Sequence, residues 1–147
     1  MRISTKGEYG IRALLELAQR YGQGYVQSTE IASAREIPEN YLYQLLITLR
    51  KAGLVRSRRG PQGGHMLARS PERISLEEAV IALEGPIAPV SCVQENVVDD
   101  CPFGEECPVR EVWQEITDVT RCILRRTTFA DLARREREKL AAKASRD

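Results

Sequence analysis

Three cysteines lie in one short polar stretch of the chain, and closely spaced thiolates are a common way to hold a metal centre. They are Cys92, Cys101 and Cys107, with the spacing C-x8-C-x5-C. Cys101 and Cys107 each precede a proline, and proline disfavours helix at the residue before it. We therefore predict a loop, because on a continuous helix these two side chains would point apart. The stretch also carries five acids: Glu95, Asp99, Asp100, Glu105 and Glu106.

The spacing leaves more than one kind of site open. Zinc usually takes a fourth cysteine or histidine in a paired C-x2-C arrangement, and the sequence has no such pair. An iron–sulfur cluster accepts thiolates and occasionally another type of ligand, so a cluster is favoured over zinc. Buried cysteines and a redox disulfide are the alternatives without a metal. Cys122 is interpreted as a packing residue, and His65, the single histidine, as a structural residue or a DNA contact.

Cys107 is also placed where a helix should begin. Pro108 suits the first position of a helix, which makes Cys107 the predicted N-cap. The unpaired amides of residues 109–111 would then point toward its sulfur, and a helix N-terminus stabilises a thiolate.

Length and composition narrow the class of protein. A chain of 147 residues fits one domain, or one domain with an extended helix. No apolar run approaches the roughly 20 residues of a membrane span, and residues 1–18 lack the apolar core of a signal peptide. We therefore expect a cytoplasmic protein that contacts no membrane, with cysteines present as thiolates or metal ligands.

The charge is unevenly distributed along the chain. Residues 1–70 carry 11 Lys/Arg and 5 Asp/Glu, a net charge of +6, whereas residues 71–147 carry 11 and 16, a net charge of −5. The first half suits a polyanion and the second would repel it.

The basic half has the pattern of a helix-turn-helix. Apolar spacing predicts helices over 6–21, 29–35 and 39–52, with Ser28 as N-cap of the second and Gly53 ending the third. A short helix, a tight turn and a second helix are typical of that DNA-binding motif.

The third predicted helix has one face of leucines and one polar face. Asn40 and Gln44 lie on the polar face near the helix N-terminus, and their amides can pair with the edge of adenine. A solvated face on a core helix is the alternative.

A predicted hairpin follows this helix, with strands at 54–58 and 65–68 and the turn Arg-Gly-Pro-Gln-Gly-Gly at 59–64. This hairpin is interpreted as a wing whose cations contact phosphate. The residues predicted to contact DNA are Ser28, Thr29, Asn40, Tyr41, Tyr43, Gln44, Thr48, Arg50, Lys51, Arg58, Arg59, Gly60, Gly63, Gly64 and His65.

The acidic half is predicted to hold a dimer helix. Ser75 and Glu78 form a capping box for a short helix that ends near Glu84. From residue 109 an apolar stripe continues for more than twenty residues, too far to be buried on one small domain, so we predict a homodimer. Packing of the stripe on its own domain is the alternative. The predicted interface residues are Val109, Val112, Trp113, Ile116, Val119 and Ile123.

The predicted fold class is mainly α with a small β wing: a winged helix-turn-helix followed by a long C-terminal dimerisation helix. The expected domain limits are 1–84 for the DNA-binding domain, 85–108 for the cysteine loop, 109–132 for the dimer helix and 133–147 for a charged tail.

Taken together, the helix-turn-helix, the wing turn and the three cysteines closely resemble the winged-helix iron–sulfur repressors of the IscR and NsrR type. The similarity covers nearly the whole chain, through residues 1–4, 9–14, 41–46, 49–55 and 128–132. The resemblance implies a homodimeric bacterial transcription repressor, not an enzyme, that binds double-stranded operator DNA. Its affinity for DNA would be controlled by an iron–sulfur cluster that senses nitric oxide, redox or iron–sulfur status. The iron–sulfur assembly machinery would donate that cluster.

The resemblance also implies a set of ligands. Cys92, Cys101 and Cys107 would be the thiolate ligands. In the IscR type a histidine three residues after the last cysteine is the fourth ligand, but Arg110 stands there. In the NsrR type the fourth ligand is a carboxylate in the first helix of the other subunit, and Glu8 stands at that place. This set favours 4Fe–4S and leaves 2Fe–2S open.

Some residues depart from the family pattern. The first gap between cysteines is eight residues rather than five, and Tyr43 replaces a glutamate that tunes the choice of DNA site. Glu36 lies in the turn where glycine is common, so strain is expected there. Three other functions are alternatives: a zinc-stabilised winged-helix protein without sensing, an iron–sulfur electron-transfer protein, and a regulator that senses through a partner protein.

Overall fold

The computed structural model describes residues 2–97 and 100–147. Met1, part of the segment that carries the family resemblance, and Asp99, one of the five acids near the cysteines, lie outside the described residues. The elements in chain order are α1 (Thr5–Gln19), α2 (Ser28–Arg35), α3 (Glu39–Lys51), β1 (Val55–Arg58), β2 (Gly64–Leu67), η1 (Pro71–Arg73), α4 (Leu76–Glu84), η2 (Ser91–Val93), η3 (Gly104–Glu106), α5 (Pro108–Arg126) and α6 (Phe129–Arg146).

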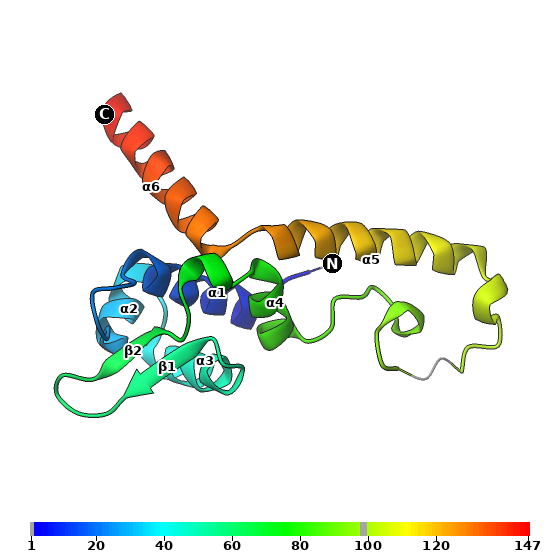
Figure 1. Ribbon diagram of the computed structural model, residues 1–147, viewed down its shortest axis with the longest axis horizontal. Helices are drawn as coiled ribbons and strands as arrows, with labels where there is room; N and C mark the ends of the chain where they lie inside the picture. Colours follow the sequence, from blue (N-terminus) through cyan, green and yellow to red (C-terminus); the bar gives the residue numbers. More distant parts are fainter. Residues whose placement is uncertain (1, 98–99) are drawn as a thin grey trace.

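The predicted fold class is confirmed. Helices α1, α2 and α3 pack together beside an antiparallel two-stranded wing, in which Val55 pairs with Leu67 and Arg58 with Gly64. One apolar core holds these elements together, and α4 and the start of α6 contribute to it. Figure 1 shows α5 running away from this compact part, with the cysteine stretch beneath its far end and α6 projecting to the other side.

Helix α1 packs closely on α4 because it presents glycines there. A Cβ built on Gly10 would lie 2.5 Å from Leu83 Cδ2, and one on Gly7 would lie 2.0 Å from Glu84 Oε1. Glu84 accepts hydrogen bonds from the backbone N–H of Ser4 (2.8 Å) and from its hydroxyl (2.7 Å). Since Ser4 caps α1, Glu84 fixes the start of α1 against the end of α4.

Two predicted helix ends are wrong. Helix α1 ends at Gln19 rather than at 21. Ser28 is the first residue of α2 rather than its N-cap, which is Gln27. Gln27 has extended backbone angles, and its side-chain amide donates a 2.7 Å hydrogen bond to the carbonyl of Gly63 in the wing turn. That tertiary contact explains why Gln27, a poor N-cap residue by type, occupies this position.

The single helix predicted over 109–132 is also wrong, and the charged tail predicted over 133–147 is part of a second helix. Helix α5 ends at Arg126, and α6 begins at Phe129 and continues to Arg146. Thr128 and Asp131 form a capping box that starts α6. The backbone at the break pairs with the segment before α4, through Leu76 N–H to Thr127 O (2.8 Å) and Phe129 N–H to Ile74 O (3.0 Å). The side chain of Phe129 is completely buried, so the break anchors α5 and α6 to the core.

None of the helices, over the residues that the structure describes, is long and apolar enough to cross a membrane.

Candidate DNA interface and cysteine site

Helix α3 has the two faces that a recognition helix needs. Its four leucines, Leu42, Leu45, Leu46 and Leu49, are at most 3% exposed and pack into the core. Asn40, Tyr43 and Gln44 are exposed on the opposite side. The polar face predicted from the sequence is therefore open to a partner.

A hollow beside α3 is lined in part by Lys6, a residue that the sequence pattern did not indicate. Lys6 of α1 lines it together with Tyr41, Gln44, Thr48 and Lys51 of α3. Two lysines from different helices thus flank Gln44, which was predicted to read a base. Lys6 could not be identified from its own sequence context, because only the packing of α1 on α3 brings it to this surface.

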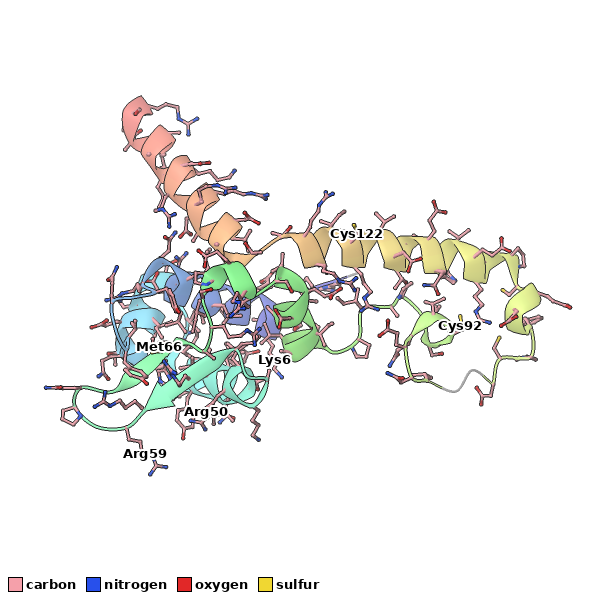
Figure 2. All side chains as sticks on the ribbon, viewed as in Figure 1. Lys6, Arg50, Arg59, Met66, Cys92 and Cys122 are labelled. Atoms are coloured by element: carbon pink, nitrogen blue, oxygen red, sulfur yellow. The ribbon has the colours of Figure 1, made fainter. Side chains whose placement is uncertain are left out.

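The wing places its cations along the same edge of the molecule. Figure 2 shows Arg50, at the end of α3, and Arg59, in the wing turn, on that edge. Both side chains are exposed. The guanidinium of Arg58 lies 5.8 Å from the centre of the Tyr25 ring, a cation–π contact that orients it.

The paired glycines fit the wing to the rest of its own chain. Gly64 has φ of +140°, and a Cβ there would lie 2.5 Å from the carbonyl oxygen of Val26. A Cβ on Gly63 would lie 2.0 Å from the carbonyl oxygen of Arg58. The backbones of Val26 and His65 exchange two hydrogen bonds of 2.8 Å. The close approach that these glycines permit is therefore internal to the chain; contact of the same residues with DNA stays a prediction.

His65 has a structural partner. Its Nδ1 lies 2.7 Å from the hydroxyl of Ser57 on the neighbouring strand. Burial, followed by the nearby charge of Arg50, lowers the pKa of His65 below its usual value. At neutral pH the imidazole is therefore uncharged. Of the two residues proposed at the start of α2, Ser28 is half-buried and Thr29 is exposed.

The cysteines occupy different local structures at the far end of α5. Cys92 lies in the short helix η2 and is half-buried, and Cys101 is exposed. Cys107 is the N-cap of α5 with extended backbone angles, and Pro108 takes the first helical position, as predicted. Its sulfur accepts no capping hydrogen bond, so the predicted contact with amides 109–111 is absent. The described residues of the stretch form a loop, as the prolines indicated, and this loop contains two single turns of 3-10 helix, η2 and η3.

The donor set suits an iron–sulfur cluster in its chemistry, since three thiols lie within sixteen residues at one end of a helix. The set is not closed within one chain. Among residues 2–97 and 100–147, no three His, Cys, Asp or Glu side chains converge closely enough to hold a metal ion. Glu8, the predicted fourth ligand, is exposed in the first turn of α1 and belongs to the winged helix, not to the loop.

Cys122 does not pack in the core of this chain. It is exposed on α5, where Figure 2 labels it, and it lines a pocket with Arg121 and Arg125. Its predicted role as a packing residue is therefore wrong for the single chain.

Helix α5 presents an apolar stripe that no described part of the chain covers. Its aliphatic side chains are 45–55% exposed: Val109, Val112, Ile116, Val119 and Ile123. Trp113 is half-buried. Thr117 of the same helix is only 4% exposed, and α5 contacts both α4 and η2. The helix thus packs on its own domain along one face and leaves the predicted interface residues free for a partner.

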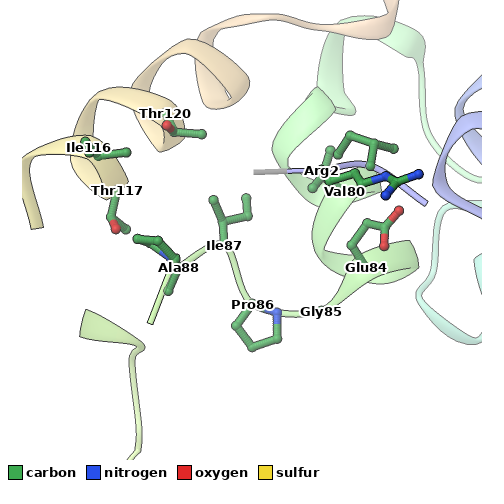
Figure 3. Close-up of a pocket in the computed structure, with 12 residues that line it drawn as sticks. Arg2, Val80, Glu84, Gly85, Pro86, Ile87, Ala88, Ile116, Thr117 and Thr120 are labelled. Atoms are coloured by element: carbon green, nitrogen blue, oxygen red, sulfur yellow. The ribbon is translucent and has the colours of Figure 1, made fainter. Parts of the chain in front are cut away.

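A pocket borders this stripe where α4 and α5 meet (Figure 3). Val80, Glu84 and Ile87 line one side, and Ile116 and Thr120 line the other. Because Ile116 belongs to both the pocket and the stripe, the two form one continuous surface.

A second set of contacts ties α6 to the helix-turn-helix. Arg35 of α2 donates to Glu136 of α6 (2.6 and 2.8 Å) and to Glu16 of α1 (2.9 Å). The hydrogen bond from Arg35 holds the pKa of Glu136 below its usual value. These ion pairs fix the first half of α6 against α1 and α2.

Comparison with known proteins decides the family. The family model described as "Rrf2: Iron-dependent Transcriptional regulator" matches residues 3–135. The chain belongs to the Rrf2 family of transcriptional regulators. Its named Rrf2 relatives are transcriptional regulators rather than enzymes.

Rrf2 relatives of two kinds are similar to this chain. The transcriptional regulator CymR of Bacillus subtilis is 42% identical over 133 residues, which cover 90% of both proteins. Its solved structure, described as the global cysteine regulator of B. subtilis, matches with a TM-score of 0.75 at 40% identity and covers 90% of this chain and 96% of that one. The structure of T. potens IscR also matches with a TM-score of 0.75, at 35% identity, and covers 95% and 90%. Similarity alone therefore does not assign the chain to the IscR/NsrR type within the Rrf2 family.

Proposed function

We propose that the chain is a homodimeric transcriptional repressor whose affinity for operator DNA depends on the state of its cysteine stretch. The observation that carries this proposal is the position of Cys92, Cys101 and Cys107 at one end of α5. The other end of the same helix is anchored in the core of the DNA-reading domain through Phe129. A change at the cysteines can therefore act on the domain that meets DNA.

On the DNA side, α3 enters the major groove and the wing lies along the backbone. Asn40 and Gln44 read base edges, since their amides match the donor and acceptor pattern of adenine. Lys6, Lys51 and Arg59 contact phosphates and add a salt-dependent, sequence-independent part to the affinity. The basic balance of residues 1–70 supports this orientation.

The dimer forms through the apolar stripe of α5. Its 19 residues give a helix about 28 Å long, and its exposed aliphatic face can pack against the same face of a second copy. The two recognition helices must then meet successive major grooves, about 34 Å apart. Their separation depends on how the two copies of α5 cross.

Cys92, Cys101 and Cys107 would hold an iron–sulfur cluster, with Glu8 of the partner subunit as the fourth ligand. When bound, the cluster supplies a crosslink that reacts with nitric oxide or oxidants, and 4Fe–4S is the type that this donor set favours. The exposed position of Glu8 on α1 leaves its carboxylate available to a neighbouring subunit. The ligands would fix the cysteine stretch relative to the partner's first helix, with the iron–sulfur assembly machinery as donor.

Anaerobic reconstitution with iron and sulfide tests the cysteine assignment. We expect the wild type and Cys122→Ser to take up iron and sulfide with visible absorption, and Cys101→Ser to lose that uptake. Cys122→Ser is the matched control, because it removes an exposed thiol outside the stretch. Equal uptake by Cys101→Ser would refute the ligand set, and colourless protein with stoichiometric zinc would favour a zinc-stabilised regulator.

A second candidate is a regulator that responds to cysteine status without a cluster. It is favoured by the 40% identity with the structure of the global cysteine regulator CymR. The reconstitution experiment separates the two candidates. Specific DNA binding by a protein that takes up no iron under anaerobic conditions would support the second.

A further inference from the structure

One arginine of α5 contacts both the cysteine stretch and the DNA-reading domain. Arg121 donates from Nε to Glu77 Oε2 of α4 (3.2 Å) and from Nη1 to Glu95 Oε1. Glu95 follows η2, three residues after Cys92. A single side chain therefore connects the first cysteine's segment to α4.

The ion pair between Arg121 and Glu77 of α4 is largely buried. Glu77 is 9% exposed, and Arg125 also donates to it, from Nε at 3.2 Å and Nη2 at 3.3 Å. Burial alone would raise the pKa of Glu77, but the hydrogen bonds from Arg125 and Arg121 hold the pKa below its usual value. A buried carboxylate is costly to leave unpaired, and Arg121 and Arg125 together satisfy Glu77.

The loop side is weak by comparison. The side chain of Glu95 is 72% exposed, whereas that of Arg121 is 23% exposed. Solvent-exposed ion pairs contribute little to stability and are readily exchanged for water. The contact between Arg121 and Glu95 can therefore form or break without disturbing the pair below it.

Helix α4 carries this contact to the DNA interface. It packs against both α1 and α3, the helices that contribute Lys6 and Gln44. Its last residue, Glu84, holds the N-terminus of α1 through Ser4. A displacement of α4 would thus move both helices that are proposed to meet DNA.

We propose that Arg121 couples the cysteine stretch to the DNA-reading domain, with Glu95 as the loop contact that makes or breaks the connection. This inference rests on the proposed function, in which the state of the stretch governs DNA affinity. Arg121 acts as a positioning residue: its guanidinium contacts Glu77 and Glu95, and it transmits position through α4. Because coupling between two sites is reciprocal, DNA binding must also stabilise the stretch.

Hydrogen–deuterium exchange of the metal-free protein tests this coupling without a cluster. Peptides covering residues 91–97 are followed with and without a DNA duplex that the protein itself selects from random sequence. We expect DNA to slow exchange of these peptides in the wild type, and this slowing to disappear in Glu95→Gln. Glu105→Gln is the matched control, since it removes the same charge from another exposed acid of the stretch and should behave as the wild type.

Exchange that slows equally in Glu95→Gln and the wild type would overturn the inference, as would a wild type whose peptides ignore DNA. Arg121→Gln also removes a partner of the buried Glu77, so the exposed Glu95 is the better site for the decisive change. Absence of DNA binding by the wild type would instead overturn the proposed function and this inference with it.

The reconstituted protein provides a second readout. In wild type and Glu105→Gln, the operator affinity should change when the cluster is removed. In Glu95→Gln we expect that change to shrink by roughly two- to fivefold, the effect of losing one partly exposed ion pair. Iron and sulfide uptake should be unchanged in Glu95→Gln, which separates loss of coupling from loss of the cluster.

Discussion

Glu36 adopts a backbone conformation that residues with a Cβ rarely take. It ends α2 with φ of 51° and ψ of 49°, in the left-handed region. Its backbone N–H donates a hydrogen bond to the carbonyl oxygen of Ala32, which closes the last turn of the helix. The strain expected at this position from the family pattern is therefore real, and it lies in the tight turn between the two helices of the DNA-binding motif.

Replacing this residue should relieve the strain. We expect Glu36→Gly to raise the free energy of unfolding by about 0.5–1 kcal/mol, because the left-handed penalty of about 1–2 kcal/mol is partly offset by glycine's greater unfolded entropy. Ala34→Gly, at an exposed position in the last turn of α2, should instead lower it by about 0.5–1 kcal/mol. Urea unfolding measures both. A neutral or destabilising Glu36→Gly would contradict the strain.

His65 gives the fold a pH dependence. Its pKa is lowered in the folded protein, first by burial and then by Arg50, so folding favours the neutral ring. As the pH falls below the unfolded value of about 6.5, the unfolded chain binds a proton that the folded chain does not, and stability falls. Unfolding measured at pH 7.5 and 5.5 should show this loss in the wild type, and a smaller loss in His65→Gln. Equal losses would show that the ring titrates alike in both states.

At the scale of elements, local signals predicted most of the fold. Leucine spacing on α3, the capping box at Ser75 and the glycine-rich wing turn all lie within a few residues, and the structure has each element there. The break after Arg126 had a local signal too, the capping box of Thr128 and Asp131, but the apolar stripe on both sides of it predicted one helix. Gln27 had no local signal, because its partner Gly63 lies in the wing.

The candidate site was harder to predict than the fold. The three cysteines were found from spacing, but the positions of Lys6, Glu77 and Arg121 depend on tertiary packing that spacing does not encode. Sequence patterns reveal donors that are neighbours in the chain. They do not reveal which helices later bring distant charges together.

Lys6 of α1 and Gln44 of α3 line the same hollow, but they are expected to affect DNA binding in different ways. Lys6→Gln should weaken binding to all DNA and reduce the slope of log affinity against log salt by about one, because one phosphate contact is lost. Lys143→Gln, on the exposed end of α6, is the control and should change little. Titrations at several salt concentrations would show this. An unchanged slope in Lys6→Gln would remove it from the interface.

Gln44→Ala should act on sequence choice instead. Loss of a bidentate amide contact should cost about 1–3 kcal/mol on the selected operator and little on unrelated DNA. The measurement is the ratio of the two affinities in the same buffer. Equal weakening on both duplexes would show that Gln44 does not read a base.

At the scale of the whole molecule, α5 separates two surfaces with different tasks. One face packs on α4, and the other presents the apolar stripe. Burying that stripe against a second copy would remove an exposed apolar surface of the kind that marks protein interfaces. The same helix would then set both the spacing of the recognition helices and the position of the cysteines.

A charge in the stripe should separate the subunits. We expect Val119→Glu to raise the dimer dissociation constant by about tenfold or more, since each 1.4 kcal/mol lost from the interface is about a factor of ten. Leu140→Glu changes an exposed apolar residue on α6, outside the stripe, and should leave the dimer intact. Sedimentation equilibrium compares the two. A fully dimeric Val119→Glu would contradict the proposed interface.

The most direct test of the account is the operator affinity of one anaerobic preparation before and after its cluster is removed. Fluorescence anisotropy with the selected duplex gives both values at the same protein and salt concentrations. We predict that removal weakens binding by about tenfold or more. Without the cluster, only a minor fraction of dimers would hold the two recognition helices at the separation that DNA binding requires. An affinity that is the same with and without iron and sulfide would contradict control of DNA binding by the cysteine stretch.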